Sequence, residues 1–520
     1  MKLRRTPLVV LTGLAALAAG VLTATTPLAT AAPSASTSDR AVLTTYAKDT
    51  WRSMAAMTDP ATGLPADNID GALDAGTRSG YTSPTNIGAY LWSTVVARDT
   101  GLITSVDAHQ RMAKTLRTLA RLDRHDPSGM FYNWYDPHTG AKLRVWPENG
   151  SVVKPFLSSV DNGWLATALL LVSRADRGLA EQANALRTPM DFGFYYDAKE
   201  NAPGGQIRGG FWDEDPHDPA AVKGNYRGRG PDVWYTGHHY GAFNTEPRMA
   251  SYLGIAAGQI PQQHYFGTYR TFQNDNCDYS WTETKPVGEW RTYLGVRVFE
   301  GALPYRGMDV VPTWGGSMFE ALMVPLFVPE ETWGPYSWGI NHPLYVKAQI
   351  EHGLDEAKYG YWGFSPSSDP QGGYREYGVD QLGLDGGGYT SDEERTSVDQ
   401  PFDGCRAGSP APTSYGDGVV TPHASFLAYR YAPKAALENL AKIKNDLDGY
   451  GPGGFYDAAG TRSHKVARRY LSLDQGMVMA ALGNALADDD MRTYVSTGAM
   501  EQKLRPLMEM EHFSAKENGQ

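Results

Sequence analysis

Cysteine is almost absent from this chain of 520 residues, which contains only Cys277 and Cys405. Neither lies at a spacing typical of a zinc or haem site, so the sequence predicts no metal and no cofactor. A G-x-S-x-G segment and a glycine-rich phosphate loop are also missing, which argues against a serine hydrolase of the α/β type and against a nucleotide enzyme. A single disulfide between the two cysteines stays open, because an exported chain folds in an oxidising compartment.

Positive charge is scarce as well. The net charge is −11 at pH 7, and lysine and arginine form no cluster along the chain. Binding to nucleic acid requires a basic surface, so nucleic acid is excluded as a partner. The same balance disfavours a strongly anionic polymer as a substrate.

The N-terminus has the pattern of a secretory signal peptide: a basic start, the apolar run 8–22, and the small residues Ala29 to Ala31. The alternative is an uncleaved anchor helix, for which the apolar run is short. We expect residues 1–32 to be removed and residues 33–40 to be flexible. Residues 41–520 are then expected to form one large domain, secreted, extracellular, monomeric and free of the membrane.

The aromatic residues are unevenly distributed among types, with 13 Trp and 30 Tyr against 16 Phe. Trp and Tyr combine a flat apolar face with one polar atom, and this combination matches the C–H faces and hydroxyl rim of a sugar ring. Most of these side chains serve core packing in any fold. Their excess over Phe nevertheless favours a groove that binds a saccharide.

Helical patterns recur along the chain and are separated by long loops rich in Gly, Trp, Tyr, Asp and Pro. Regular helices with long loops at one end are typical of an all-α (α/α)6 toroid. The stretch 372–412 is glycine-rich and then acidic, and we interpret it as a loop insertion that forms a wall of the cleft. The predicted helices are 41–57, 86–99, 105–122, 159–174, 179–190, 246–255, 317–326, 343–353, 421–431, 434–445, 472–487 and 491–510.

Four acidic residues stand at the predicted starts of helices and beside Trp or Gly: Asp161, Glu246, Glu320 and Asp474. Hydrolysis of a glycosidic bond needs two carboxylic groups, one protonated to donate to the leaving oxygen and one ionised. Acidic residues also favour first helical turns for a simpler reason, because they complement the helix dipole and cap free N–H groups. Either role fits each residue taken alone.

Several segments together resemble one family, the glucoamylase-like family that includes bacterial endo-β-1,2-glucanases. The glycoamylase-like segment of cyclic β-1,2-glucan synthases is a more distant relative of the same pattern. The resemblance spans most of the chain and implies an (α/α)6 toroid that acts on a glucan. The segments are Thr82–Gly88, Ser159–Trp164, Trp314–Glu320, Tyr361–Ser365, Gly454–Asp457 and Asp474–Gly476.

The resemblance also implies roles for individual residues. Glu246 matches the general acid of the family, and Asp161 matches an aspartate that faces the cleft. Asp457 and Asp474 match acidic positions late in the chain, and either suits the base. Related synthase segments have a glutamate after the Trp-Gly-aromatic-Ser motif, whereas residues 366–368 here carry no carboxylate. This difference favours inversion over a retaining mechanism.

The sequence therefore predicts a secreted glycoside hydrolase of a neutral glucan, with an oligo- or polysaccharide as its partner. Two alternatives stay open: a hydrolase or lyase of the same fold that acts on another cell-wall or capsular polysaccharide, and a noncatalytic sugar-binding protein. The acids expected to react are Glu246, Asp161, Asp474, Asp457 and Glu320. The side chains expected to contact the sugar are Trp134, Trp164, His239, Tyr240, Trp314, Trp362 and Arg248.

Overall fold

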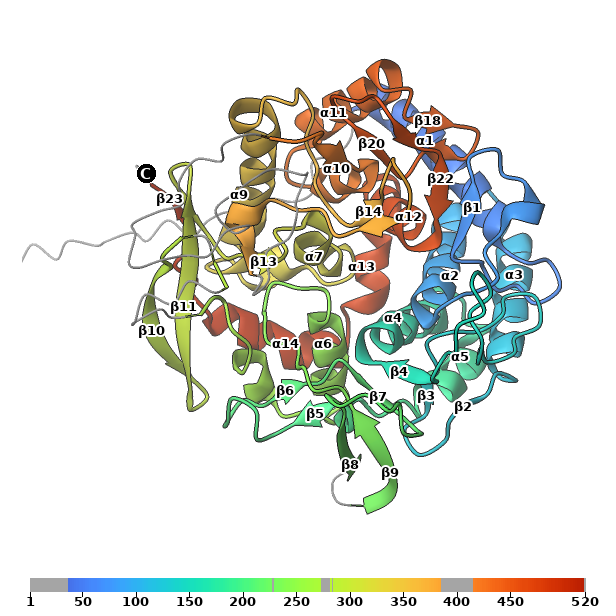
Figure 1. Cartoon of the computed structure of the whole chain (residues 1–520), viewed down its shortest axis with the longest axis vertical. Helices are drawn as coiled ribbons and strands as arrows, with labels where there is room; N and C mark the ends of the chain where they lie inside the picture. Colours follow the sequence, from blue (N-terminus) through green and yellow to red (C-terminus); the bar gives the residue numbers. More distant parts are fainter. Residues whose placement is uncertain (1–35, 227–228, 273–280, 283, 385–414, 519–520) are drawn as a thin grey trace, which may run out of the picture.

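The computed structural model describes residues 36–226, 229–272, 281–282, 284–384 and 415–518. The expected signal peptide, both cysteines and most of the 372–412 loop lie outside the described residues. The chain from α1 onward winds into two concentric rings of helices, which Figure 1 shows nearly end-on. This arrangement confirms the helical toroid that the sequence predicts.

Six helices of the described chain form the inner ring, and neighbours in the ring pack against one another except at α6 and α7, where direct packing is weak. In ring order they are α2 (Pro84–Asp99), α4 (Ser159–Ala175), α6 (Arg248–Ala256), α7 (Met318–Leu322), α10 (Pro422–Ala428) and α12 (Ser472–Leu486). The outer helices each cover one of them in the same order: α3 (Ser105–Leu119), α5 (Ala180–Arg187), α14 (Ala499–Met510), α9 (Trp338–Glu351), α11 (Pro433–Asp446) and α1 (Thr37–Met57). Two shorter helices, α8 (Glu330–Trp333) and α13 (Asp490–Val495), complete the helical part of the described chain.

Glycine brings the inner helices close together. A Cβ atom at Gly476 of α12 would lie 2.6 Å from the Cβ atom of Ala89 in α2, and one at Gly163 of α4 would lie 3.2 Å from the Cβ atom of Ala250 in α6. Trp92 of α2 donates its indole N–H to the carbonyl oxygen of Gly476 at 2.9 Å. Small side chains therefore set the spacing of the ring at these crossings.

The ring closes between α6 and α7 through one buried arginine. Arg248 donates to the carbonyl oxygens of Glu320 at 2.9 Å and Ala321 at 2.7 Å. Its guanidinium also forms two hydrogen bonds with the Glu330 carboxylate, at 2.8 and 2.9 Å. Because the short helix α7 offers little apolar surface, these charge-assisted bonds are its main connection to α6.

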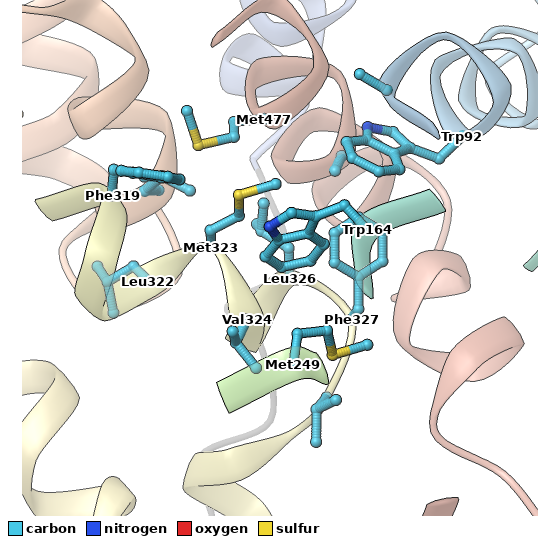
Figure 2. Close-up of a cluster of buried hydrophobic side chains, with 14 of the residues drawn as sticks. Trp92, Trp164, Met249, Phe319, Leu322, Met323, Val324, Leu326, Phe327 and Met477 are labelled. Atoms are coloured by element: carbon cyan, nitrogen blue, oxygen red, sulfur yellow. The ribbon is translucent and has the colours of Figure 1, made fainter. Parts of the chain in front are cut away.

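The axis of the ring is filled by apolar side chains, so the toroid has a packed floor rather than an open channel (Figure 2). Trp92, Trp164, Met249 and Met477, from different inner helices, lie around the segment 323–327, which follows α7 (Figure 2). The Phe327 ring lies 5.1 Å from the ring of Trp92 and 5.8 Å from that of Trp164, measured between centroids. A cleft formed by the surrounding loops therefore has a rigid base.

Short strands lie around the ring of helices, so the chain is not all-α as the sequence predicts. Helices account for 42% of the described residues and strands for 19%. One four-stranded antiparallel sheet has the order β4 (Phe156–Ser158), β7 (Gly210–Trp212), β9 (Arg229–Tyr235) and β8 (Val222–Tyr226). The other has the order β10 (Val287–Tyr293), β11 (Val296–Tyr305), β12 (Met308–Val310) and β23 (Lys516–Glu517).

The remaining strands are two or three residues long and shape the loops around the cleft. They pair as β1 (Asn68–Asp70) with β22 (Arg469–Leu471), β2 (Arg124–His125) with β3 (Met130–Phe131), β5 (Tyr196–Asp197) with β6 (Gln206–Ile207), β13 (Thr313–Trp314) with β16 (Gly383–Leu384), β14 (Ser367–Ser368) with β15 (Tyr374–Arg375), and β18 (Tyr450–Gly451) with β19 (Gly454–Phe455). β17 (Val419–Val420), β20 (Ala458–Gly460) and β21 (Val466–Ala467) form a three-stranded sheet.

Three boundaries differ from the sequence prediction. The segment expected to be flexible, 33–40, already contains the first turn of α1, which Ser36 caps by accepting the N–H of Asp39. The helix predicted to begin at Pro343 begins at Trp338, with the proline inside it. The predicted helix 491–510 is two helices: the first ends at Val495, and Gly498, with a positive φ of 66°, precedes the first residue of the second.

None of the helices in the described part of the chain has both the length and the apolar character needed to span a membrane.

Candidate active site

A cavity of about 560 Å³ opens where several inner helices begin. The starts of α2, α4, α6 and α12 all contribute to it, together with the β1–β22 strands and the β14–β15 hairpin. Its lining includes Asp67, Asn68, Tyr81, Ser83, Thr85, Asn86, Trp134, Trp146, Glu148, Asp161, Glu246, Ser368, Tyr374, Arg469 and Asp474. Five of these side chains are acidic and one is basic, so the cavity disfavours an anionic ligand.

Capping explains why acidic side chains gather at these helix starts. Ser158 accepts the N–H of Asp161 at 3.1 Å, and Ser317 accepts the N–H of Glu320 at 3.2 Å. The serines thus satisfy the free N–H groups, and the carboxylates of the first turn are left to face the cavity. The positive ends of the helix dipoles favour their ionised forms.

Glu246 immediately precedes α6 and carries the strongest sign of a proton donor. Its Oε2 atom accepts the indole N–H of Trp164 at 2.6 Å, and its own backbone N–H donates to Oε2 of Glu320 at 2.7 Å. Burial raises the pKa of Glu246 well above its ordinary value, and the charges of Glu320 and Asp161 raise it further against the opposing effect of Trp164. Glu246 is therefore a carboxylic acid that holds its proton to a higher pH than an ordinary glutamate does.

Two further acids lie close to Glu246. Burial raises the pKa of Glu320 to about 7, although the hydrogen bond from the Glu246 backbone and the charge of Arg248 oppose the shift. Asp161 accepts a hydrogen bond from the hydroxyl of Thr85 at 2.7 Å, which ties the start of α4 to the start of α2. Glu320 acts on Glu246 through its charge, while Asp161 lines the cavity itself.

Asp457 and Asp474 form a buried pair of carboxyl groups that share a hydrogen bond. Burial and the charge of Asp474 raise the pKa of Asp457 well above its ordinary value, whereas burial raises the pKa of Asp474 only to about 7. Asp457 is therefore the partner that holds the proton, and Asp474 is the partner that ionises. The backbone N–H of Ser368 donates to Asp457 at 2.6 Å and fixes the protonated partner.

His423, at the start of α10, lies beside this pair. Its Nδ1 atom is 3.4 Å from Oδ2 of Asp474 and 2.8 Å from the hydroxyl of Thr421. The Thr421 hydroxyl uses its only proton to donate to the carbonyl oxygen of Asp457 at 2.8 Å. The hydrogen bond between His423 and Thr421 must therefore use the proton on Nδ1 of the histidine. Burial lowers the pKa of His423 to about 4, and the ring stays neutral.

Glu246 and Asp474 stand opposite one another. In the inner ring, α6 and α12 are three positions apart among six helices, which is the largest separation the ring allows. Both side chains line the same cavity. A ligand in the cavity would therefore have a protonated acid on one side and an ionisable carboxylate on the other.

The residues that the sequence predicts to contact a sugar differ in their burial and in whether they line the cavity. Trp134 lines the cavity, as expected for a residue that touches a ligand. Trp164 and Trp362 are buried, with 0% and 2% of their surface exposed, so neither offers a ring face to a sugar. Arg248 is also buried and closes the ring of helices, which corrects its expected role as a substrate contact.

Three more predicted contacts are not in the lining of the cavity. His239 is 3.3 Å from Oδ2 of Asp197, a carboxylate that also pairs with Arg208 at 2.5 Å. Burial raises the pKa of the Tyr240 hydroxyl, and the charge of nearby Glu246 raises it further. Trp314 is partly exposed on β13 and packs against the ring of Trp281 at 5.8 Å between centroids.

Sequence reasoning missed several contributors to the cavity, among them Tyr374 and Asp67. Tyr374 projects from the β14–β15 hairpin with 53% of its surface exposed, and the hairpin is fixed because Asp369 pairs with Arg375 at 2.7 Å. Desolvation of its hydroxyl group raises the pKa of Tyr374, and the charges of Asp474 and Asp457 raise it further. Asp67, at the start of the β1 strand, is another contributor. The Gly372-Gly373 turn before Tyr374 could have indicated that Tyr374 follows the turn of a hairpin.

In the ranges that the structure describes, no group of three or more His, Cys, Asp or Glu side chains is arranged to hold a metal ion.

Two segments of the chain match known protein families. Residues 280–491 match the Glycoamylase family, which is described as "Putative glucoamylase". The C-terminal segment of this chain is therefore similar to the glycoamylase family. Residues 45–190 match a second family, described as a protein of unknown function, DUF3131. The glycoamylase segment contains Glu320, Asp457 and Asp474, whereas Glu246 lies between the two matched segments.

A curated relative supports the same assignment. The chain is 27% identical over 269 residues to the cyclic β-(1,2)-glucan synthase NdvB of Rhizobium meliloti (strain 1021). The match includes 49% of this chain but only 7% of that protein, so the chain spans a small part of its relative.

Solved structures share the fold over almost the whole chain. A Bacteroides uniformis protein with the same description as the family is 17% identical with a TM-score of 0.61, and the match covers 91% of this chain and 97% of that one. The endo-β-1,2-glucanase of Chitinophaga pinensis, solved with sophorotriose and glucose, is 15% identical with a TM-score of 0.59 and coverage of 90% and 97%. The endo-β-1,2-glucanase of Talaromyces funiculosus, solved with β-1,2-glucan, is 12% identical with a TM-score of 0.55 and coverage of 90% and 89%.

Proposed function

We propose that the chain is a glycoside hydrolase that cleaves a neutral glucan, and that its substrate is a β-1,2-linked glucan. The observation that carries the proposal is the protonated Glu246 opposite the ionisable Asp474 in one cavity. Two carboxylic groups in different protonation states are what glycosidic hydrolysis requires. The solved relatives named as endo-β-1,2-glucanases support the choice of linkage.

In the proposed reaction, Glu246 gives its proton to the glycosidic oxygen while the bond from that oxygen to the anomeric carbon breaks. Protonation of the leaving oxygen avoids the release of an alkoxide. The hydrogen bond from Trp164 holds the carboxyl group in place and stabilises the carboxylate that remains. The nearby Glu320 keeps Glu246 protonated until the substrate has bound.

Asp474 is the proposed base. It accepts a proton from a water molecule, whose oxygen attacks the anomeric carbon from the face opposite Glu246, and the product has the inverted configuration. Asp457 keeps its own proton and donates a hydrogen bond to Asp474, which holds the base in one orientation. Solvent then returns the proton from Asp474 to Glu246, so one water molecule is consumed in each cycle.

A panel of glucans with defined linkages tests the proposal directly. The protein is expected to release new reducing ends from β-1,2-glucan, and NMR of the first products is expected to show the inverted anomer. Retained configuration would exclude Asp474 as a base that acts through water. Binding without new reducing ends would support a sugar-binding protein instead, and an unsaturated product that absorbs in the ultraviolet would support a lyase.

Glu246→Gln is the decisive variant. The amide keeps the shape of the side chain and cannot donate the catalytic proton, so we expect kcat to fall by at least about a hundredfold. The oligosaccharide affinity, measured by calorimetry, is expected to stay near that of the wild type. Exposed Glu438 of α11 provides the control, because Glu438→Gln makes the same chemical change outside the cavity. Normal turnover by the Glu246 variant would remove it from the mechanism.

We also propose that the protein is exported and that residues 1–32 are removed. The basic start, the apolar run and the small residues before position 33 support this proposal. Mass spectrometry of the mature N-terminus, after expression of the full chain in a secreting host, tests it. A mature chain that still begins at Met1 inside the cell would contradict it.

A further inference from the structure

Three aromatic rings form a corner at one end of the cavity. The ring centroids are 5.5 Å apart for Tyr81 and Trp134, 4.4 Å for Tyr81 and Trp146, and 5.2 Å for Trp134 and Trp146. Trp134 is nearly perpendicular to both other rings, with interplanar angles of 84° and 82°. All three rings are partly exposed and line the cavity, unlike Trp92 and Trp164 in the buried floor.

A polar network adjoins this aromatic corner. The carboxylate of Asp67 accepts the side-chain amide of Asn86 at 2.9 Å and that of Asn68 at 3.0 Å. The amide of Asn68 also lies 3.4 Å from the hydroxyl of Tyr81. These four side chains all line the cavity. The corner therefore combines apolar ring faces with oriented hydrogen-bonding groups, which is the pairing that a sugar ring needs.

The corner lies next to the proposed base. The backbone N–H of Ser472, the first residue of α12, donates to the carbonyl oxygen of Asp67 at 2.7 Å. In the β1–β22 pairing, Asn68 is the register partner of Leu471. The charge of Asp67 also contributes to the raised pKa of Asp474. A sugar held in the corner would be adjacent to the unit that reacts.

We propose that Tyr81, Trp134, Trp146 and Asp67 form a binding subsite for one glucosyl unit, adjacent to the cleavage point on the α12 side. The inference rests on the proposed hydrolase function and deepens it. The C–H face of the sugar packs in the aromatic corner, and its hydroxyl groups bond to Asp67 and to the hydroxyl of Tyr81. The subsite sets the minimum length of oligosaccharide that binds well.

Trp146 is the best residue for a test because it lies in a surface loop, where truncation leaves the helical rings intact. In the inactive Glu246→Gln background, calorimetry compares Trp146→Ala with the parent on β-1,2-linked oligosaccharides of increasing length. We expect the affinity to fall on the order of tenfold for oligosaccharides that reach the corner, and to stay unchanged for shorter ones. Trp146→Phe is expected to recover part of the loss.

A matched control is Trp290→Ala, because Trp290 is 41% exposed on the β10 strand and does not line the cavity. This variant is expected to bind every oligosaccharide as the parent does. Unchanged binding by Trp146→Ala, or an equal loss at every length, would overturn the subsite.

The two proposals fail in distinguishable ways. In the active background, cleavage of β-1,2-glucan with product lengths unaffected by Trp146→Ala would overturn the subsite and leave the hydrolase standing. Length-dependent binding in the corner without any cleavage by the wild type would leave the subsite standing and overturn the hydrolase. Absence of binding to every glucan in the panel would overturn both.

Discussion

At the scale of single residues, the proposed reaction depends on which carboxyl groups hold a proton. Glu246 and Asp474 differ in this respect because their neighbours differ: Glu246 faces the charge of Glu320, whereas Asp474 receives a hydrogen bond from protonated Asp457. The pH profile of activity therefore reports on named contacts. Each limb of the profile can be moved by a substitution beside the group that titrates.

The acidic limb should follow Asp474. The base must be ionised, and its pKa is raised to about 7, so we expect kcat/KM to fall as the pH decreases below about 7. The apparent value belongs to the Asp457–Asp474 pair, since the two groups share one hydrogen bond. Initial rates on β-1,2-glucan between acidic and alkaline pH measure the limb. A limb with the pKa of an ordinary exposed aspartate would contradict the assignment.

The alkaline limb should follow Glu246. Glu320→Gln removes a negative charge that raises the pKa of Glu246, and its amide oxygen can still accept the Glu246 backbone N–H. The pKa of Glu246 should decrease, so the alkaline limb of kcat/KM should move to lower pH. Glu438→Gln, on the exposed side of α11, should leave the limb unchanged. An unchanged or higher limb in the Glu320 variant would show that Glu246 is not the titrating acid.

At the scale of elements, the inner helices owe their close spacing to glycine. An alanine Cβ at position 476 would lie only 2.6 Å from Ala89, whereas one at position 163 would lie 3.2 Å from Ala250. Overpacking a core costs about 1–3 kcal/mol. Replacing glycine with alanine inside a helix returns up to about 1 kcal/mol through helix propensity. The two positions should therefore respond differently.

We expect Gly476→Ala to lower the melting temperature and Gly163→Ala to leave it nearly unchanged, because only the first forces α2 and α12 apart. Differential scanning calorimetry of both variants measures the difference. Since Asp474 and the start of α2 line the same cavity, the Gly476 variant should also lose activity. Equal melting temperatures for the two variants would refute the close-packing explanation.

The elements also explain how much could be foreseen from sequence. Helices such as α2 and α4 were predicted nearly to the residue, since Ser83 and Ser158 are recognisable caps ahead of apolar runs. The short strands were not, because two or three residues carry no detectable alternation. Asp67 and Tyr374 were missed for that reason: Asp67 precedes a strand that pairs with the distant β22, and Tyr374 lies in a hairpin whose strands are only two residues long.

The candidate site was foreseeable where chemistry and helix starts coincide. Asp161, Glu246 and Asp474 line the cavity, as expected of acids that open inner helices. Arg248 and Trp164 were expected to touch the sugar, and both are buried instead. A long polar side chain such as that of Arg248 can connect two helices as well as bind a ligand. Burial depends on the tertiary packing of distant segments, so the local sequence around these residues could not predict it.

At the scale of the whole molecule, the C-terminal segment completes the structure from outside the ring. Glu511 follows α14 and accepts a hydrogen bond from Nε of buried Arg270 at 2.7 Å. Glu300 of β11 lies in the same buried cluster, with Arg270 at 3.8 Å. Burial and the charge of Glu511 raise the pKa of Glu300 from 4.5 to about 8. One arginine thus serves two buried carboxyl groups.

This cluster should make stability depend on pH. Folding raises the pKa of Glu300, so the unfolded chain loses that proton first, and the contribution to stability is present below about pH 4.5 and lost as the pH rises through about 8. Glu300→Gln should remove this term, so its melting temperature should decline less than that of the wild type between pH 5 and about pH 8. Glu289→Gln is the control, because Glu289 is the register partner of Glu300 on β10 with a side chain 61% exposed. Parallel declines in all three proteins would contradict the prediction.

The inner helices α2, α4, α6 and α12 begin at the cleft, and this affects how such a molecule can change its specificity. The reacting acids stand on rigid helix starts, whereas the aromatic corner and the Tyr374 hairpin stand on separate connecting loops. Exchanging one loop therefore alters which sugar is held without moving the groups that transfer protons. The scaffold separates recognition from reactivity, so a new linkage preference requires rebuilding one wall of the cleft rather than the whole barrel.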